Sequence, residues 1–151
     1  QVRCCARTVR GADVAAKKGW RAKFATRAQS EVTVLEKPFG GVPAGARLLI
    51  ATPARIAAYA AAIPPGETRD VAAMRKDLAA EAGADAACPL TTGMFLRIAA
   101  EVAIEDMNAG APPEAVTPFW RLVDPDSPLA ARLSCGVKRL LNLRAAESAL
   151  A

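Results

Sequence analysis

The chain has 151 residues, of which 52% are hydrophobic, so it can bury one core and predicts one main domain. Only 5% of the residues are aromatic and alanine is frequent, which favours closely packed helices over a β-sandwich. No uninterrupted run of about 18 apolar residues predicts a membrane span and no apolar signal core occurs near the start, so the expected location is the cytoplasm.

Positive charge is concentrated at the start of the chain. Lys and Arg number 20 against 15 Asp and Glu, but residues 1–30 alone hold eight bases, Lys17, Lys18 and Arg21 among them, and one acid. We therefore predict a basic, flexible arm over residues 1–30, which is either a solvated tail or an arm that follows nucleic-acid phosphates. Trp20 and Phe24 are spaced i, i+4, which predicts a short helix that docks on the domain.

Residues 31–51 predict a lead-in segment with short strands. A β-type run at 31–35 is followed by a loop rich in glycine and proline at 37–43, and an apolar run at 47–50 predicts a second short strand. The paired glycines at 40 and 41 are not followed by Gly-Lys-Ser/Thr, so this loop is interpreted as a turn and not as a phosphate loop.

The main domain is predicted over residues 52–151, and it begins with helices. Thr52 and Pro53 provide a hydroxyl cap and a proline at the first helical position, which predicts a helix over 52–62. Asp70 can cap a second helix that ends near Gly83, and a third is expected from about residue 91 to Met107. Two helices joined by a tight turn are typical of a helix-turn-helix, whose second helix enters a DNA groove.

The segment after the third helix predicts a small wing. Residues 116–123 are apolar and aromatic, as in a strand, and the proline-rich run 124–128 predicts its turn. A closing helix is expected over 138–147. The predicted fold class is therefore mainly α with a small β-hairpin wing, a winged helix-turn-helix.

The cysteines offer few routes to catalysis or metal binding. The chain has no histidine, which excludes Ser-His and Cys-His catalytic pairs, and its four cysteines include no Cys-x-x-Cys pair, so no metal or cofactor is predicted. Cys88 precedes the third helix, where the helix dipole favours a thiolate, so it is either a packed structural residue or a reactive thiol. Cys135 is expected to be a half-buried structural thiol.

One stretch resembles a known family. Pro118-Phe119-Trp120-Arg121-Leu122-Val123 is similar to the active-site segment of alkylguanine-DNA alkyltransferases, in which Pro-Cys-His-Arg is followed by two aliphatic residues. Phe119 stands at the position of the nucleophilic cysteine, and Trp120 at that of the histidine that activates it. The resemblance continues at Leu129, at the closing run 137–141 and at the proline-glycine-acid turn 63–67, and covers about residues 52–147.

The resemblance implies roles for several residues. Arg97 would fill the gap left by a base rotated out of DNA, although an ordinary ion pair with Glu101 is the alternative interpretation. Further expected DNA contacts are Thr92, Asn108, matched to a family asparagine, and Arg121. The pocket would be lined by Phe119 and Trp120, as stacking walls or simply as core, and by Arg132 in the lid segment 130–136. Val71 replaces a family tyrosine.

The functional expectation is a non-catalytic, alkyltransferase-like protein that binds double-stranded DNA, with alkylated guanine as the candidate lesion. Methyl transfer is not expected, because the nucleophile and its histidine are replaced. Two alternatives are a protein-interaction module on a retired repair fold and an enzyme that depends on the Cys88 thiol.

Overall fold

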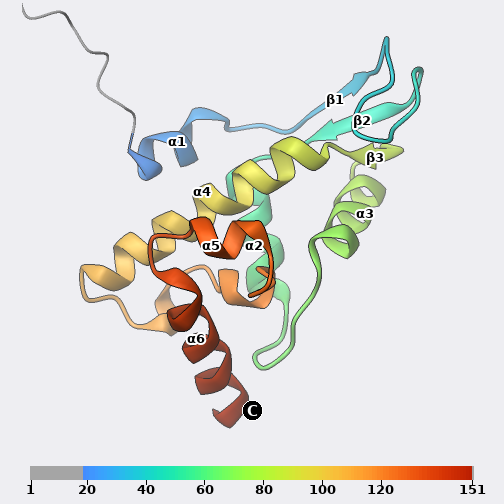
Figure 1. Cartoon of the computed structure of the whole chain (residues 1–151). Coiled ribbons are helices and arrows are strands. Elements are labelled where there is room, and N and C mark those ends of the chain that lie inside the picture. The colour runs from blue at the N-terminus through green and yellow to red at the C-terminus, as the bar shows by residue number, and fades with distance from the viewer. Residues whose placement is uncertain (1–18, 151) are drawn as a thin grey trace, which may run out of the picture.

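The protein's structure, a computed structural model, describes residues 19–150. In this part of the chain the fold is mainly helical with a small three-stranded sheet (Figure 1). The helices and strands are, in order, α1 (Trp20–Thr26), β1 (Glu31–Val34), β2 (Arg47–Ile50), α2 (Pro53–Ala62), α3 (Val71–Glu81), β3 (Ala86–Ala87), α4 (Pro89–Asn108), α5 (Pro128–Arg132) and α6 (Gly136–Leu150). Two 3-10 turns, η1 (Pro113–Ala115) and η2 (Phe119–Arg121), lie between α4 and α5.

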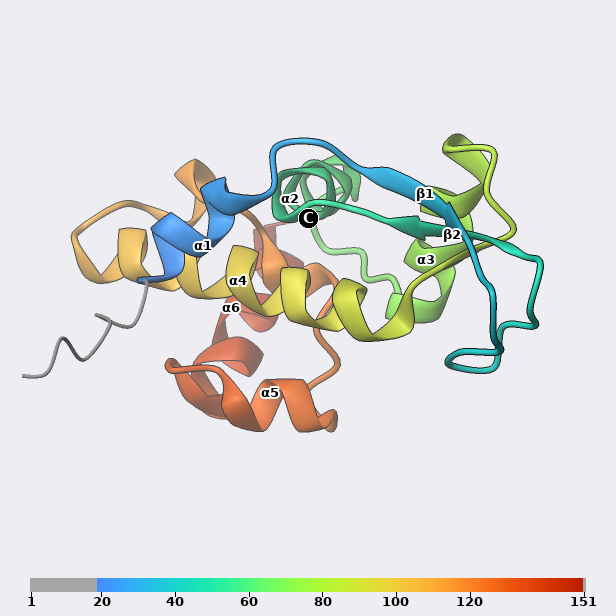
Figure 2. The same ribbon diagram turned by 90° about the horizontal axis from the view of Figure 1, so that it is seen from above.

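Helix α4 is the central element of the core. It begins with Pro89 at its first position and runs for 20 residues, with Gly93 in its second turn, and it ends two residues before Gly110. Helices α1 and α2 and the turn η2 pack against it. The apolar side chains of Phe95, Ile98 and Met107 are buried, and that of Val102 is half-buried. Seen from above, α1 and α5 lie on opposite sides of α4 (Figure 2).

The predicted helix starts are confirmed at α2 and α3. The Thr52 hydroxyl accepts the N–H of Arg55 at 3.0 Å, and Pro53 occupies the first turn of α2. The Asp70 carboxylate accepts the N–H of Ala73 at 2.6 Å. Each cap satisfies one of the backbone donors that a helix start leaves free.

The sheet joins the lead-in segment to the turn between α3 and α4. Strands β1 and β2 pair antiparallel, with Glu31 opposite Ile50, and β2 pairs parallel with the two-residue strand β3. The Arg47 N–H donates to the Asp85 carboxylate at 2.8 Å, and the Asp85 N–H donates to the Arg47 carbonyl at 2.9 Å. The short strands at 31–34 and 47–50 were predicted, whereas β3 was not.

The predicted strand over 116–123 is wrong. This segment instead forms the 3-10 turn η2 and then runs through a turn into α5, so no hairpin follows α4. The physical reason is burial: Phe119, Trp120, Leu122 and Val123 are all buried, whereas a half-exposed strand would alternate buried and exposed residues. The antiparallel pair of the fold is β1–β2, which precedes α2 in the chain. The coarse fold class, mainly helical with a small sheet, is confirmed.

Of the flexible arm predicted over 1–30, the structure describes residues 19–30, and α1 within them is a helix docked on the core. Trp20 and Phe24 of α1 pack against the main core, as the i, i+4 spacing predicted, and Arg21 forms an ion pair with Asp106 of α4. Lys17 and Lys18 lie outside the described residues. Among residues 19–150, no helix has the length and apolar character needed to cross a membrane.

Candidate functional site

The segment 118–123, which we call the family-like segment because it resembles the alkyltransferase motif, contributes its aromatic pair to the core. Phe119 is 0% exposed and Trp120 is 3% exposed, and their rings meet edge to face with centroids 5.3 Å apart and planes at 78°. Edge-to-face packing of this kind is typical of buried aromatic pairs. Both rings are therefore part of the core, and Phe119 has no exposed surface on which a base could stack. Trp120 also lines a second cavity, so its role as a stacking wall stays a prediction.

A cavity lies beside α4, next to the residues Phe119 and Trp120 that were predicted to line a pocket. We call it the corner cavity: a volume of about 480 Å³ where the start of α3, the first half of α4 and the segment 122–129 meet. Its apolar lining is Val71, Leu96, Leu122, Val123 and Leu129, and its polar lining is Thr68, Arg69, Asp70, Asp124, Ser127 and Arg144. Gly93 of α4 also faces it, and an added Cβ there would meet nothing within 4 Å.

Backbone contacts fix the rim of the corner cavity. The N–H of Arg69 donates to the carbonyl of Arg121 at 2.8 Å, which ties the loop before α3 to η2. The Ser127 hydroxyl caps α5 by accepting the Ala130 N–H at 3.2 Å. The cavity is thus bounded by the capped starts of α3 and α5, both held by hydrogen bonds.

A half-buried cation, Arg144, lines the corner cavity. The guanidinium of Arg144, from α6, donates to the Trp120 carbonyl and the Val123 carbonyl, each at 2.6 Å. Burial lowers the pKa of Arg144 from its ordinary value, and nearby Asp124 opposes the effect. Arg144 therefore links the closing helix to the family-like segment and brings positive charge to the cavity.

Arg121 is not free to contact DNA. Its Nε lies 3.0 and 3.1 Å from the two carboxylate oxygens of Glu147, and its Nη1 donates to the Ile63 carbonyl at 2.6 Å. The side chain is only 11% exposed. The predicted DNA contact is therefore replaced by a structural role, in which Arg121 joins η2, α6 and the end of α2.

Thr92 and Asn108 do not form one surface. Thr92 is 1% exposed in the first half of α4, so it cannot reach a DNA groove, and this prediction is wrong. Asn108 is exposed at the far end of the helix, about 24 Å away along its axis, and accepts a hydrogen bond from Arg139 at 2.7 Å. Thr92 and Asn108 therefore do not form one DNA-contacting surface on α4.

Arg97 does not form the ion pair with Glu101 that was the alternative to a DNA contact. The predicted ion pair with Glu101 is absent among the described side chains, because Glu101 is 2% exposed and instead accepts the N–H of Ser134 at 3.0 Å and its hydroxyl. Arg97 donates to the Arg132 carbonyl at 3.3 Å, and its guanidinium lies 5.1 Å from the centroid of the Trp20 ring. Arg132 itself is exposed at the end of α5.

The two described cysteines are poor nucleophile candidates. Cys88 is 4% exposed, as a packed structural residue would be, and its N–H donates to the Leu49 carbonyl at 2.8 Å. Cys135 is half-buried, as predicted, and burial, its main influence, raises the pKa of its thiol. Neither lines the corner cavity. Within residues 19–150, no group of three metal-binding side chains occurs.

Reasoning from the sequence missed most residues of the corner cavity. Leu122 and Val123 belong to the family-like segment, so the signal was present but was assigned to the aromatic residues just before them. Gly93 stands at a helical position where a larger residue would be expected, which is a weak signal of open space. Nothing in the sequence pointed to Arg144.

Comparison with known proteins assigns no family. No family model, no curated protein and no solved structure matches this chain.

Proposed function

We propose that this protein binds double-stranded DNA without catalysing alkyl transfer, and that the corner cavity receives an alkylated guanine rotated out of the duplex. The observation that supports the proposal most is the position of the cavity. It lies against α4, the second helix of the pair α3–α4, and beside the segment that resembles the alkyltransferase active site. A protein that reads a single base in a duplex needs such a pocket next to its contact helix.

The chemistry of the cavity suits a base that carries an alkyl group. Its volume is within the usual range for small-ligand pockets, about 300–1,000 Å³. Val71, Val123 and Leu129 offer apolar surface to an alkyl substituent, and the Ser127 hydroxyl and the Asp124 carboxylate can meet the polar edge of a base. No cysteine and no histidine lines it, so it offers no acceptor for the alkyl group.

Phosphate contacts would come from the rim and from the start of the chain. Arg69 is exposed at the mouth of the cavity. Residues 1–18 contain five bases and one acid, whereas the rest of the chain has a balance of +1. DNA binding would therefore depend strongly on this basic segment, with the cavity providing the preference for the lesion.

The proposal is tested by titrating the protein into labelled duplexes that differ only in one O6-methylguanine. Fluorescence anisotropy should show salt-dependent binding to both duplexes and at least about tenfold tighter binding to the modified one, a difference of about 1.4 kcal/mol. Equal affinities for the two duplexes would contradict recognition of the lesion. An absence of binding at low salt would contradict DNA binding itself.

A second candidate function is protein interaction, which another cavity favours. The lower cavity, of about 600 Å³, lies between α6 and the loop that contains η1 and η2, and prolines 65, 113 and 118 line it together with Leu143 and Leu150. Leu150 is 83% exposed. A pull-down with nuclease treatment separates the two functions, because a partner bridged by DNA is lost and a directly bound protein remains.

A further inference from the structure

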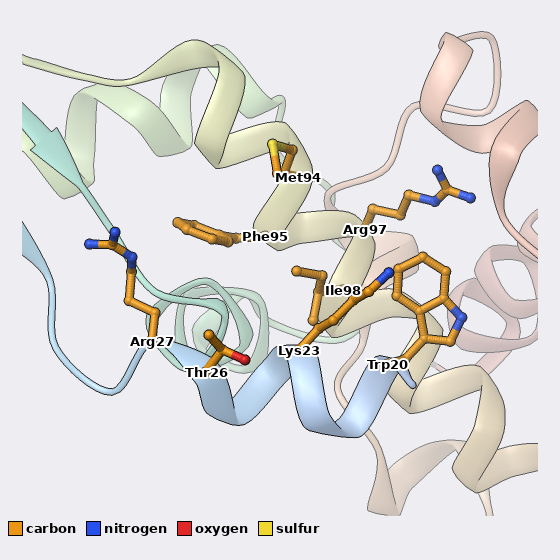
Figure 3. Close-up of a pocket in the computed structure, with 8 residues that line it drawn as sticks. All are labelled: Trp20, Lys23, Thr26, Arg27, Met94, Phe95, Arg97 and Ile98. Atoms are coloured by element: carbon orange, nitrogen blue, oxygen red, sulfur yellow. The ribbon is translucent and has the colours of Figure 1, made fainter. Parts of the chain in front are cut away.

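A third cavity lies between α4 and α1, on another face of α4 than the corner cavity. This α1–α4 cavity has a volume of about 430 Å³. From the α1 side it is lined by Trp20, Lys23, Thr26 and Arg27, and from α4 by Met94, Phe95, Arg97 and Ile98 (Figure 3). Gly93 and Leu96 of α4 face the corner cavity instead, so the two sites use different faces of one helix.

The floor of the α1–α4 cavity is apolar. Phe95 and Ile98 are each 9% exposed, and Met94 is 52% exposed at the edge. The indole of Trp20 closes one end, and Arg27, seven residues further along, stands at the other (Figure 3). Such a floor favours an apolar body that displaces water from it.

The lining carries three cations and no carboxylate. Lys23 holds its ammonium 4.3 Å from the centroid of the Trp20 ring, and Arg97 lies 5.1 Å from it. Arg27 is paired only with Glu31, at 3.4 Å and in an exposed i, i+4 arrangement, which is worth little in water. The positive charge at the cavity is therefore poorly compensated, and an anion that replaces water there gains a cationic partner.

We infer that the α1–α4 cavity binds an amphipathic organic anion, a compact apolar or aromatic body with one carboxylate, sulfonate or phosphate group. The apolar body lies on Phe95 and Ile98 beside the indole, and the anionic group lies on the α1 side of the cavity, which carries Lys23 and Arg27 one helical turn apart. A DNA backbone fits less well, because its phosphates bring no apolar body to fill the floor. The site is independent of the proposed DNA function.

The first test uses two probes that differ in the anionic group alone. 8-Anilinonaphthalene-1-sulfonate carries a sulfonate, and N-phenyl-1-naphthylamine is its neutral counterpart. We expect the sulfonate to bind at least about tenfold more tightly, which corresponds to about 1.4 kcal/mol. Energy transfer from tryptophan should fall in Trp20→Phe, because Trp20 is the tryptophan that lines the cavity. Equal affinity for both probes, or transfer unchanged in Trp20→Phe, would overturn the inference.

The second test removes the charges one at a time in the full chain. Lys23→Gln and Arg27→Gln should each weaken binding of the sulfonate about three- to tenfold and leave the neutral probe unchanged. Lys76→Gln, an exposed substitution on α3, is the matched control and should change neither. Thermal melts of each variant establish that it is folded. An equal loss in Lys76→Gln, or competitive displacement of the sulfonate by a short plain duplex, would contradict a dedicated small-anion site.

Discussion

At the scale of single residues, Tyr59 offers a direct check of the packing between α2 and α3. It is half-buried and donates a hydrogen bond to Asp77. Burial, and then this hydrogen bond, raise its pKa to about 12 from 10.0. Because the neutral phenol is favoured in the fold, its stabilising contribution is complete below pH 10 and is lost as the pH rises towards 12.

Tyr59 is the chain's one tyrosine, so alkaline titration of its absorbance reads this pKa without interference. Asp77→Ala should lower the pKa while leaving it above 10.0, since burial is the larger cause. Asp126→Ala, an exposed carboxylate away from Tyr59, is the control and should leave it unchanged. A wild-type value near 10.0 would show that Tyr59 is not packed as described.

The ion pair of Arg121 and Glu147 is the second residue-scale prediction. Their side chains are 11% and 16% exposed, so removing one partner leaves a largely buried charge. Arg121→Leu should lower the free energy of unfolding by about 3 kcal/mol, and Arg121→Leu with Glu147→Leu should recover part of this loss. Chemical denaturation measures both; a loss no larger than that of exposed Arg132→Leu would contradict the structural role of Arg121.

The ion pair of Arg121 and Glu147 also predicts how the free energy of unfolding depends on pH in acid. The hydrogen bond from Arg121 is the main cause that holds the pKa of Glu147 below its ordinary 4.5, so the carboxylate stabilises the fold above that pH. This stabilisation fades as the pH falls through the lowered pKa. The difference in unfolding free energy between wild type and Glu147→Gln should therefore be constant near neutrality and shrink in acid. A difference that grows in acid would reverse the sign of the argument.

At the scale of elements, α4 is tied to the segment between α5 and α6 by the buried carboxylate of Glu101. Ser134→Ala removes the hydroxyl that donates to it and leaves only the backbone N–H. We expect a loss of about 1–3 kcal/mol in the free energy of unfolding. Ser148→Ala, exposed near the end of α6, is the matched control and should stay within about 0.5 kcal/mol of wild type. Equal effects would show that Glu101 does not need this donor.

The elements that the sequence predicted are those with local signals. Caps and helical spacing located α2, α3 and α4 to within about two residues, and the two short runs at 31–35 and 47–50 are strands. The failures depend on tertiary structure. The 116–123 segment looks like a strand because it is apolar, yet it is apolar because it is buried from all sides. Strand β3 has two residues and forms only because β2 is adjacent.

The candidate site was predicted less well than the fold, for a related reason. A cavity is the space that packing leaves open, and the residues around the corner cavity come from α3, α4, α6 and the 122–129 segment. The resemblance pointed to the segment 118–123, of which Leu122 and Val123 line the corner cavity. It could not show that all four of these residues, Phe119, Trp120, Leu122 and Val123, are buried, with Leu122 and Val123 on the side of the corner cavity.

At the scale of the whole molecule, charge is divided unevenly. Residues 1–18 carry five bases against one acid, and the rest of the chain is close to neutral. Replacing those five bases by glutamine in the full chain should reduce the salt dependence of DNA binding by up to about four units of log K per log salt. The affinity ratio between modified and plain duplex should persist, measured where both still bind. An unchanged slope would show that this segment does not contact phosphates.

The central claim, that the corner cavity holds the rotated base, is tested most directly by filling it. Gly93 lines the cavity, has open space beside it and lies in a helix that gains stability from any ordinary residue, so Gly93→Leu should fold at least as well as wild type. Gly93→Ala gives the same helical gain with little filling. The measurement is the ratio of affinities for duplexes with and without O6-methylguanine in the two variants. We predict that Gly93→Ala keeps the preference and that Gly93→Leu loses it while retaining affinity for the plain duplex; a preference undiminished in Gly93→Leu would contradict the account.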